Sequence, residues 1–310
     1  MSFRFAVRFP LATGALALVL SLAAAALGAR DARAFCRTTT SEKFRPTDAK
    51  PCDDSERPIQ WPSKCVGYSV QKNGSVQLDV ARVREVVRTA FDGWSTADCG
   101  TCPGVGTGNP SITFVDQGTV ACNKAEYNET SGNTNVVTFW DSGWPYAGGD
   151  VTLALTTVTF SVASGDIYDA DIEVNSDPSL NPLTIDDPTG KPVYDLRSIL
   201  AHETGHFLGL AHTQTSNAEA TMLAKYKIGD SYMRTPSVDD VCGVCTIYPS
   251  TRVAECQATP HGGLVGECGG GPDQSTKKGC GCTVVTGEPL GLAELGVVLG
   301  AIGLAAVIRG

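Results

Sequence analysis

The residues best suited to chemistry lie in one run, His-Glu-Thr-Gly-His-Phe-Leu-Gly-Leu-Ala-His, which begins at His202. Residues four apart lie on the same face of a helix, so His202 and His206 can bind one metal ion. Glu203 can reach a water on that ion without being a ligand. Gly209 can adopt a positive φ that ends the helix and returns His212 as a third ligand. Three imidazoles leave one coordination position open, which is typical of catalytic zinc.

The whole chain has four histidines, and three of them fall in this run. For His-Glu-x-x-His alone, an exposed helix with incidental histidines is the competing interpretation. That alternative does not account for the extra Gly and the third His at their spacing. We therefore predict a zinc centre with His202, His206 and His212 as ligands and with Glu203 as catalytic base.

Three helices and several strands are expected to position this centre. Apolar residues recur at three- and four-residue spacing over residues 80–94 and predict an amphipathic helix. The metal motif lies in a second predicted helix, residues 195–211. A third begins near Ser237, which has capping-box spacing to Asp240, and ends by Pro249. Strand-like segments rich in Val, Thr and Ile separate the first two helices, at residues 111–115, 136–140, 151–160 and 167–175.

The composition is that of an acidic globular protein. Apolar residues make up 42% of the chain and charged residues 18%, so wholesale disorder is excluded. The formal net charge is −9, and removing residues 1–34 (four Arg, one Asp) leaves 20 basic and 32 acidic side chains, or −12. Such a surface repels phosphate backbones, and no basic stripe offsets it. Nucleic acid is therefore not an expected partner.

Residues 1–34 have the layout of a secretory signal peptide. Two arginines precede an apolar stretch, and the small-residue site Ala-Arg-Ala ends at residue 34, which predicts cleavage before Phe35. A retained membrane helix is the alternative. We expect an exported protein, extracellular or at the cell surface. Residues 35–57 are polar without clear periodicity and are interpreted as a tethered N-terminal segment.

All 12 cysteines follow residue 34, and their number is even. In an exported protein this pattern indicates disulfides, although the sequence does not give their pairing. Two Cys-x-x-Cys pairs, Cys99/Cys102 and Cys242/Cys245, leave a structural zinc open as an alternative.

The chain beyond the third helix changes character. Residues 251–288 are rich in Gly and Cys and predict a linker, and residues 289–310 a hydrophobic tail. Within that tail, residues 290–308 are long enough to span a bilayer as a helix, although Glu294 interrupts them. A buried helix of the main domain is the alternative. Cys-Gly-Cys at residues 280–282, an apolar helix and a terminal Arg resemble the myxobacterial C-terminal sorting signal. This resemblance implies association with the envelope membrane or sorting to the surface.

The extended pattern His-Glu-x-x-His-x-x-Gly-x-x-His is the metzincin signature, and its flanks resemble the matrixin branch. Met222, in Ala-Thr-Met, matches the methionine of the turn that this family places beneath the metal. Further similarity lies at the end of the family's first helix, in the strand before the active-site helix and in its third helix. The corresponding residues are Ala90-Phe91-x-x-Trp94, 165–175, Asp239-Asp240 and Tyr248-Pro249.

The resemblance implies an α+β fold, with a twisted mixed sheet, three main helices and an active-site cleft over zinc. It implies a matrixin-like catalytic domain at residues 58–250 and a secreted or surface-attached zinc endopeptidase acting on proteins or peptides. Glu203 would pass a proton from a zinc-activated water to the leaving amine. Met222 would form an apolar floor below the ligands.

Two rivals stay open: a catalytically silent surface adhesin on the same scaffold, and a zinc hydrolase of small molecules. The intact Glu203 and the three histidines favour the peptidase.

The sequence also departs from animal matrixins. It lacks their pro-segment motif Pro-Arg-Cys-Gly-x-Pro-Asp, which Cys36 could mimic unless it forms a disulfide. Only His261 is left over, so their second, histidine-rich zinc site cannot be built in that way. Calcium is an additional expectation at acidic loops, with ordinary turn chemistry as its alternative. The aspartates concerned are Asp166, Asp169, Asp171, Asp186 and Asp187.

Overall fold

A mixed sheet of six strands lies at the centre of the fold, in the order β10-β5-β6-β4-β2-β3. The predicted signal peptide and most of the predicted tail lie outside the residues that this computed structural model describes. Those described residues are 35–41, 52, 56–146, 149, 152–213, 219–269 and 297–302.

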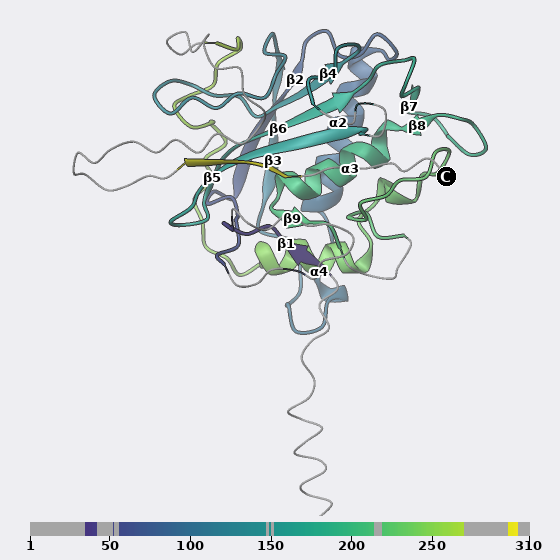
Figure 1. Cartoon of the computed structure of the whole chain (residues 1–310). Coiled ribbons are helices and arrows are strands. Elements are labelled where there is room, and N and C mark those ends of the chain that lie inside the picture. The colour runs from purple at the N-terminus through teal and green to yellow at the C-terminus, as the bar shows by residue number, and fades with distance from the viewer. Residues whose placement is uncertain are drawn as a thin grey trace, which may run out of the picture. The chain divides into compact units, whose positions relative to one another are not determined.

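The sheet combines a parallel centre with an antiparallel edge (Figure 1). β3, β2, β4 and β6 run parallel to one another, whereas β5 is antiparallel to β6, and β10 is antiparallel to β5. The central strands are buried on both faces, as expected where helices and loops cover a parallel sheet. The strands are β2 (Cys65–Gln71), β3 (Thr113–Val120), β4 (Val136–Trp140), β5 (Ala154–Ser161), β6 (Ile167–Asn175) and β10 (Val297–Ile302).

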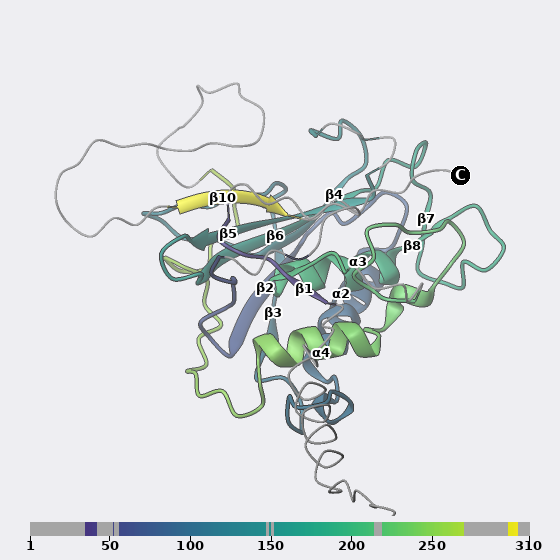
Figure 2. The same cartoon turned by 60° about the horizontal axis from the view of Figure 1, so that its bottom comes forward.

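Two helices pack against the same face of the sheet, α2 (Val80–Ser95) and α3 (Leu196–Phe207) (Figure 2). The apolar stripe of α2 is buried, and its Trp94 indole donates to the carbonyl of Ala201 in α3 at 2.9 Å. The third helix, α4 (Val238–Ile247), lies farther from the sheet. The predicted α+β fold with a mixed sheet and three helices is confirmed.

α3, which was predicted to extend over residues 195–211, ends at Phe207. Gly209 adopts φ 92°, and its N–H donates to His206 O at 2.9 Å, which closes α3. A Cβ on Gly209 would lie 2.7 Å from Ile59 O, so this turn requires glycine. The chain then continues into β9 (Leu210–Ala211).

Short elements complete the fold. β7 (Leu183–Thr184) and β8 (Tyr194–Asp195) pair in parallel directly before α3. The 3-10 turn η1 (Cys99–Thr101) follows α2, and the 3-10 turn η2 (Tyr232–Arg234) precedes α4.

The N-terminal segment is joined to the end of the active-site helix. β1 (Cys36–Arg37) pairs antiparallel with β9, and Thr38 N donates to Gly209 O at 2.9 Å. Cys36 forms a disulfide with Cys52, so it is not free to mimic the pro-segment thiolate. The expectation of a disulfide at this position is confirmed.

Five disulfides link distant parts of the described chain. Each Cys-x-x-Cys motif is bonded to the other, which joins η1 to the buried side of α4. A structural zinc at these motifs is therefore wrong, because all four sulfurs are bonded in pairs. The disulfides are Cys36–Cys52, Cys65–Cys256, Cys99–Cys245, Cys102–Cys242 and Cys122–Cys268.

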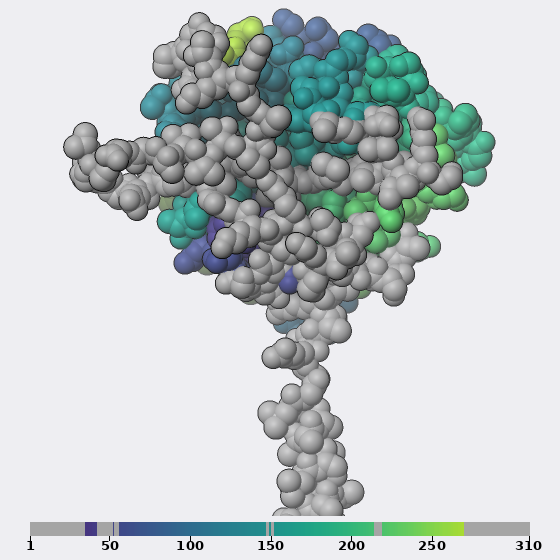
Figure 3. Space-filling model, viewed as in Figure 1, coloured from purple at the N-terminus to yellow at the C-terminus, as the bar shows by residue number. Residues whose placement is uncertain are grey.

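Residues 251–269, interpreted above as the start of a linker, run back along the sheet. Lys64 N donates to Glu255 O at 3.0 Å, and Gly67 N to Ala258 O at 3.1 Å. Two disulfides fix this segment to β2 and to the end of β3. This long-range pairing gives no local sequence signal, and it ties residues 251–269 to the sheet. A catalytic domain that ends at residue 250 stays a prediction. In the space-filling view of Figure 3, teal atoms from the middle of the chain and green atoms from residues after α3 adjoin each other at the right of the molecule.

The predicted apolar tail includes β10, which pairs antiparallel with β5 along residues 297–302. A helix was expected there, but a short apolar run does not distinguish helix from strand. The edge of β5 offers free backbone groups that a strand can pair with. The rest of the tail lies outside the described residues. Among the described helices, none has the length and apolar character needed to cross a membrane.

Candidate metal centre

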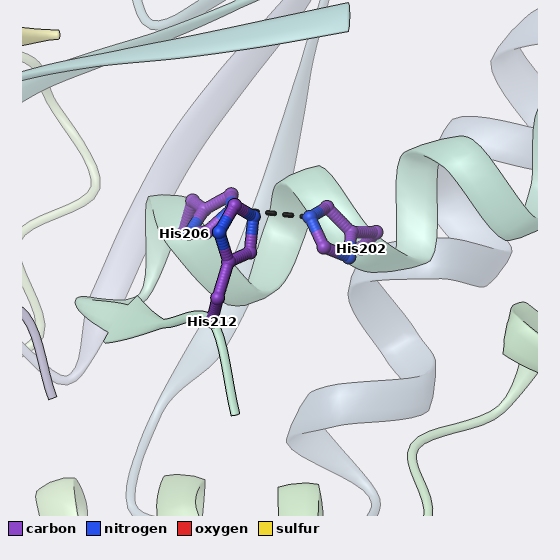
Figure 4. A group of neighbouring side chains, drawn as sticks. All are labelled: His202, His206 and His212. Carbon is purple, nitrogen blue, oxygen red and sulfur yellow. Dashed lines mark hydrogen bonds between the residues drawn. The ribbon is translucent and has the colours of Figure 1, made fainter. Parts of the chain in front are cut away.

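Three histidine rings converge at the end of the active-site helix (Figure 4). His202 and His206 project from α3, and His212 comes from the chain just after β9. His206 Nε2 lies 3.1 Å from His202 Nε2 and 3.3 Å from His212 Nε2. All three rings are buried, with 5% exposure or less. The sequence-predicted ligands are thus brought together.

Backbone carbonyls orient two of the rings. His202 Nδ1 donates to Thr221 O at 2.6 Å, and His206 Nδ1 donates to Leu210 O at 2.9 Å. These bonds place the proton on Nδ1 and direct the lone pair of Nε2 toward the centre. Burial lowers the pKa of all three rings, that of His212 to about 3. Neutral imidazole is the form that binds metal.

The geometry fits a tetrahedral zinc ion. With Zn–N bonds of about 2.05 Å, two ligand atoms of a tetrahedron lie roughly 3.3 Å apart. The two Nε2 separations of 3.1 and 3.3 Å match this value. Without a cation, three lone pairs would face one another in a buried site. Among the described residues, these histidines form the one group of three or more ligating side chains whose ligand atoms lie within 4.8 Å of one another.

Glu203 lies beside the triad and is fully buried. Its Oε2 accepts a hydrogen bond of 2.6 Å from the hydroxyl of Thr156 on β5, whereas its Oε1 has no partner. Burial raises the pKa of Glu203 to about 8, and the Thr156 hydrogen bond opposes that rise. A nearby divalent cation favours the ionised form. One carboxylate oxygen is therefore fixed and the other is free to accept a proton.

Met222 lies directly behind the active-site helix. A Cβ on Gly205 would meet the Met222 sulfur at 2.2 Å, so glycine between His202 and His206 lets the methionine pack this close to the helix. Asp240 of α4 accepts from Thr221 N at 2.7 Å and from Met222 N at 3.1 Å. The same carboxylate caps its own helix through Ser237. Asp240 thus joins the methionine turn to α4.

Sequence reasoning missed several residues of this centre. The carbonyls of Thr221 and Leu210 orient the ligands, but a backbone group carries no residue-type signal. Thr156 resembles any threonine of a strand, where this residue type is common. Only the pairing of β5 with β6 beside α3 shows that it faces Glu203.

Calcium is not supported at the acidic positions considered above. Asp166 accepts from the Ser164 hydroxyl at 2.7 Å, and Asp187 from Thr189 N at 3.0 Å, as in ordinary turns. Asp186 forms an exposed ion pair with Arg82. The remaining two aspartates are buried on β6.

Because of the buried aspartates Asp169 and Asp171, we expect the stability of the folded chain to depend on pH. Burial raises the pKa of both, that of Asp169 to about 8. An Asp with a higher pKa in the folded chain binds protons more tightly there, so its contribution to stability falls as pH rises from about 4 to 8. We expect Asp169→Asn to raise Tm more at pH 8 than at pH 5, measured by thermal unfolding in chelator. Exposed Asp186→Asn is the control, and an equal change at both pH values would contradict this expectation.

Comparisons with known proteins agree with this geometry. The model of the matrixin family matches residues 60–249. Human neutrophil collagenase is 27% identical over 190 residues, which cover 61% of this chain and 33% of the human protein. The chain therefore matches about a third of the length of that relative. The matched region runs from β2 to α4 and contains the histidine triad, Glu203 and Met222.

Proposed function

The chain belongs to the matrixin family of metalloproteases, and from this premise we propose that it is a zinc-dependent endopeptidase that cleaves peptide bonds in proteins. The observation that carries the proposal is the convergence of three neutral imidazoles beside a buried carboxylate with one free oxygen. Hydrolysis of a peptide bond at such a site needs a Lewis acid that binds the attacking water and a base within hydrogen-bonding distance of that water.

His202, His206 and His212 would hold the zinc ion. Zinc bound there supplies Lewis-acid chemistry, since it polarises a carbonyl oxygen and increases the acidity of water. Glu203 takes a proton from the attacking water at its free Oε1 and delivers it to the nitrogen of the leaving amine. Met222 packs behind the helix and keeps the two helical ligands in place. Burial around the centre excludes bulk water from the proton transfer.

We also propose that the protein works outside the cytoplasm, secreted or at the cell surface. The signal-like residues 1–34 and the five disulfides support export. The apolar residues near the C-terminus would then serve in sorting or in attachment to the envelope membrane. The substrates would be proteins or peptides.

Cleavage of an unfolded polypeptide tests the proposal. Purified protein loaded with zinc is incubated with reduced, alkylated casein, with and without a chelator. Fragments are expected with zinc, none with chelator, and recovery when zinc is added back. An intact polypeptide in all three samples, despite one zinc per chain, would favour the silent adhesin. Hydrolysis of small esters or amides alone would favour the small-molecule hydrolase.

His212→Ala is expected to weaken zinc binding as well as activity, because it removes a metal–ligand bond rather than a proton carrier. A loss of at least about tenfold in zinc affinity is expected in equilibrium dialysis against a competing chelator. His261→Ala is the matched control, since His261 lies by the Tyr127 and Tyr168 rings, outside the triad. Unchanged zinc affinity in His212→Ala would remove this residue from the ligand set.

A further inference from the structure

The contact between β5 and the active-site helix assigns a role to a residue that does not touch the metal. Thr156 Oγ1 lies 2.6 Å from Glu203 Oε2 and 3.2 Å from the backbone oxygen of Glu203. Both residues have no measurable exposure. A hydroxyl that donates to an ionised carboxylate forms one of the stronger hydrogen bonds in proteins, and in this site no bulk water competes for it.

Thr156 is well suited to hold a carboxylate in a fixed place. Its β-branched side chain has little freedom at χ1, so its hydroxyl direction is set by the strand. The strand is itself held by antiparallel pairing, with Thr156 opposite Ile172 of β6. Among the described residues, Thr156 is the one side chain that donates to the Glu203 carboxylate.

The two oxygens of Glu203 are consequently not equivalent. Oε2 is occupied by Thr156, and Oε1 is buried without a partner. If the Thr156 hydroxyl were absent, the Glu203 carboxylate could rotate and populate more than one orientation. A base that must receive and return one proton loses rate when its orientation is not fixed.

We propose that Thr156 is a positioning residue that holds Oε2 of Glu203 and thereby directs Oε1 to the attacking water. This inference rests on the proposed function, since it concerns the base of that same reaction. It adds a strand residue to a centre whose other members all follow residue 201. It acts through Glu203.

Thr156→Val tests the inference, because valine keeps the shape and branching of threonine and removes only the hydroxyl. We expect kcat on a peptide substrate to fall about tenfold to a hundredfold, the range for losing a hydrogen bond to a charged group. KM should stay within about twofold, and zinc content near one per chain. Thr156→Ser should recover kcat to within about threefold of wild type.

Thr159→Val is the matched control on the same strand. Thr159 is also buried, but three positions along a strand its side chain points to the opposite face. It should leave kcat unchanged. A kcat of Thr156→Val within twofold of wild type would overturn the proposal, as would an equal loss in Thr156→Ser. If the Val variant does not fold, Thr156→Ala and Thr156→Ser decide, since they differ only in the hydroxyl.

A second measurement separates this inference from the proposed function. Crystal structures of zinc-loaded wild type and Thr156→Val would show the orientation of Glu203 without any turnover. We expect one orientation in wild type, and a turned or split carboxylate in the variant. Inactive wild type with this difference would reject the peptidase and keep the positioning role. Active wild type with an unchanged Glu203 in the variant would reject the positioning role alone.

Discussion

Replacement of Glu203 by glutamine is expected to lower kcat by at least about a hundredfold while zinc content stays near one per chain. Glutamine has nearly the same shape and can still accept from Thr156, but it cannot take a proton from water at neutral pH. His202 and His206 keep their carbonyl partners, and His212 is not changed, so the metal centre itself should be unaffected. Turnover of an unfolded polypeptide and metal analysis of the same preparation measure both effects.

Glu173→Gln is the matched control, because it makes the same chemical change at another buried glutamate. Glu173 lies on β6 and accepts from the Trp140 indole at 2.9 Å, outside the metal centre. Its folded variant should retain wild-type turnover. Full activity of Glu203→Gln would mean that another group takes the proton and that the proposed mechanism is wrong.

The parts of this centre that the sequence predicts are the local ones. Helical spacing alone places His202, Glu203 and His206 on neighbouring positions of one helix face. One glycine turn is enough to bring His212 back to them. The helix over residues 80–95 follows from its apolar period in the same way. In each case, the residues that determine the local structure lie within about twelve positions of the residues they place, so the sequence alone is enough to predict it.

The parts that escaped prediction depend on contacts between distant residues. Cys99 bonds Cys245 across 146 positions, and no rule of spacing selects that partner over Cys242. β2 is fully buried, but its Gly67 and Ser69 interrupt the apolar pattern that marks a strand. Thr156 becomes part of the centre only because β5 forms the strand next to α3. Pairing and packing of this kind require the folded chain.

The segment after α4 shows how such contacts alter an expectation about stability. If residues 251–288 were only a linker, as their composition predicts, a chain ending at Pro249 should remain soluble and active. In the folded chain, Arg252 donates to Trp61 O and to Pro62 O at 2.5 and 2.7 Å. Cys65 and Cys122 also find their disulfide partners in this segment.

We therefore expect a chain ending at Pro249 to fold poorly and a chain ending at Gly269 to fold as the full chain does. Loss of a native disulfide costs about 2–5 kcal/mol, and a domain has only about 5–15 kcal/mol of net stability. The chain ending at Pro249 loses two disulfides and has two unpaired cysteines, so its free energy of unfolding should fall by most of this net stability. Soluble yield after oxidative refolding, Tm and zinc-dependent peptidase activity measure the outcome.

Two variants separate the disulfides from the other contacts of this segment. The full chain with Cys65→Ala and Cys256→Ala should fold with a lower Tm, because the backbone hydrogen bonds to β2 persist. The chain ending at Pro249, with Cys65→Ala and Cys122→Ala to remove its free thiols, should still fold poorly. Wild-type Tm and activity in that last variant would show that residues 251–269 contribute nothing to the catalytic unit, and would support the predicted domain boundary at residue 250.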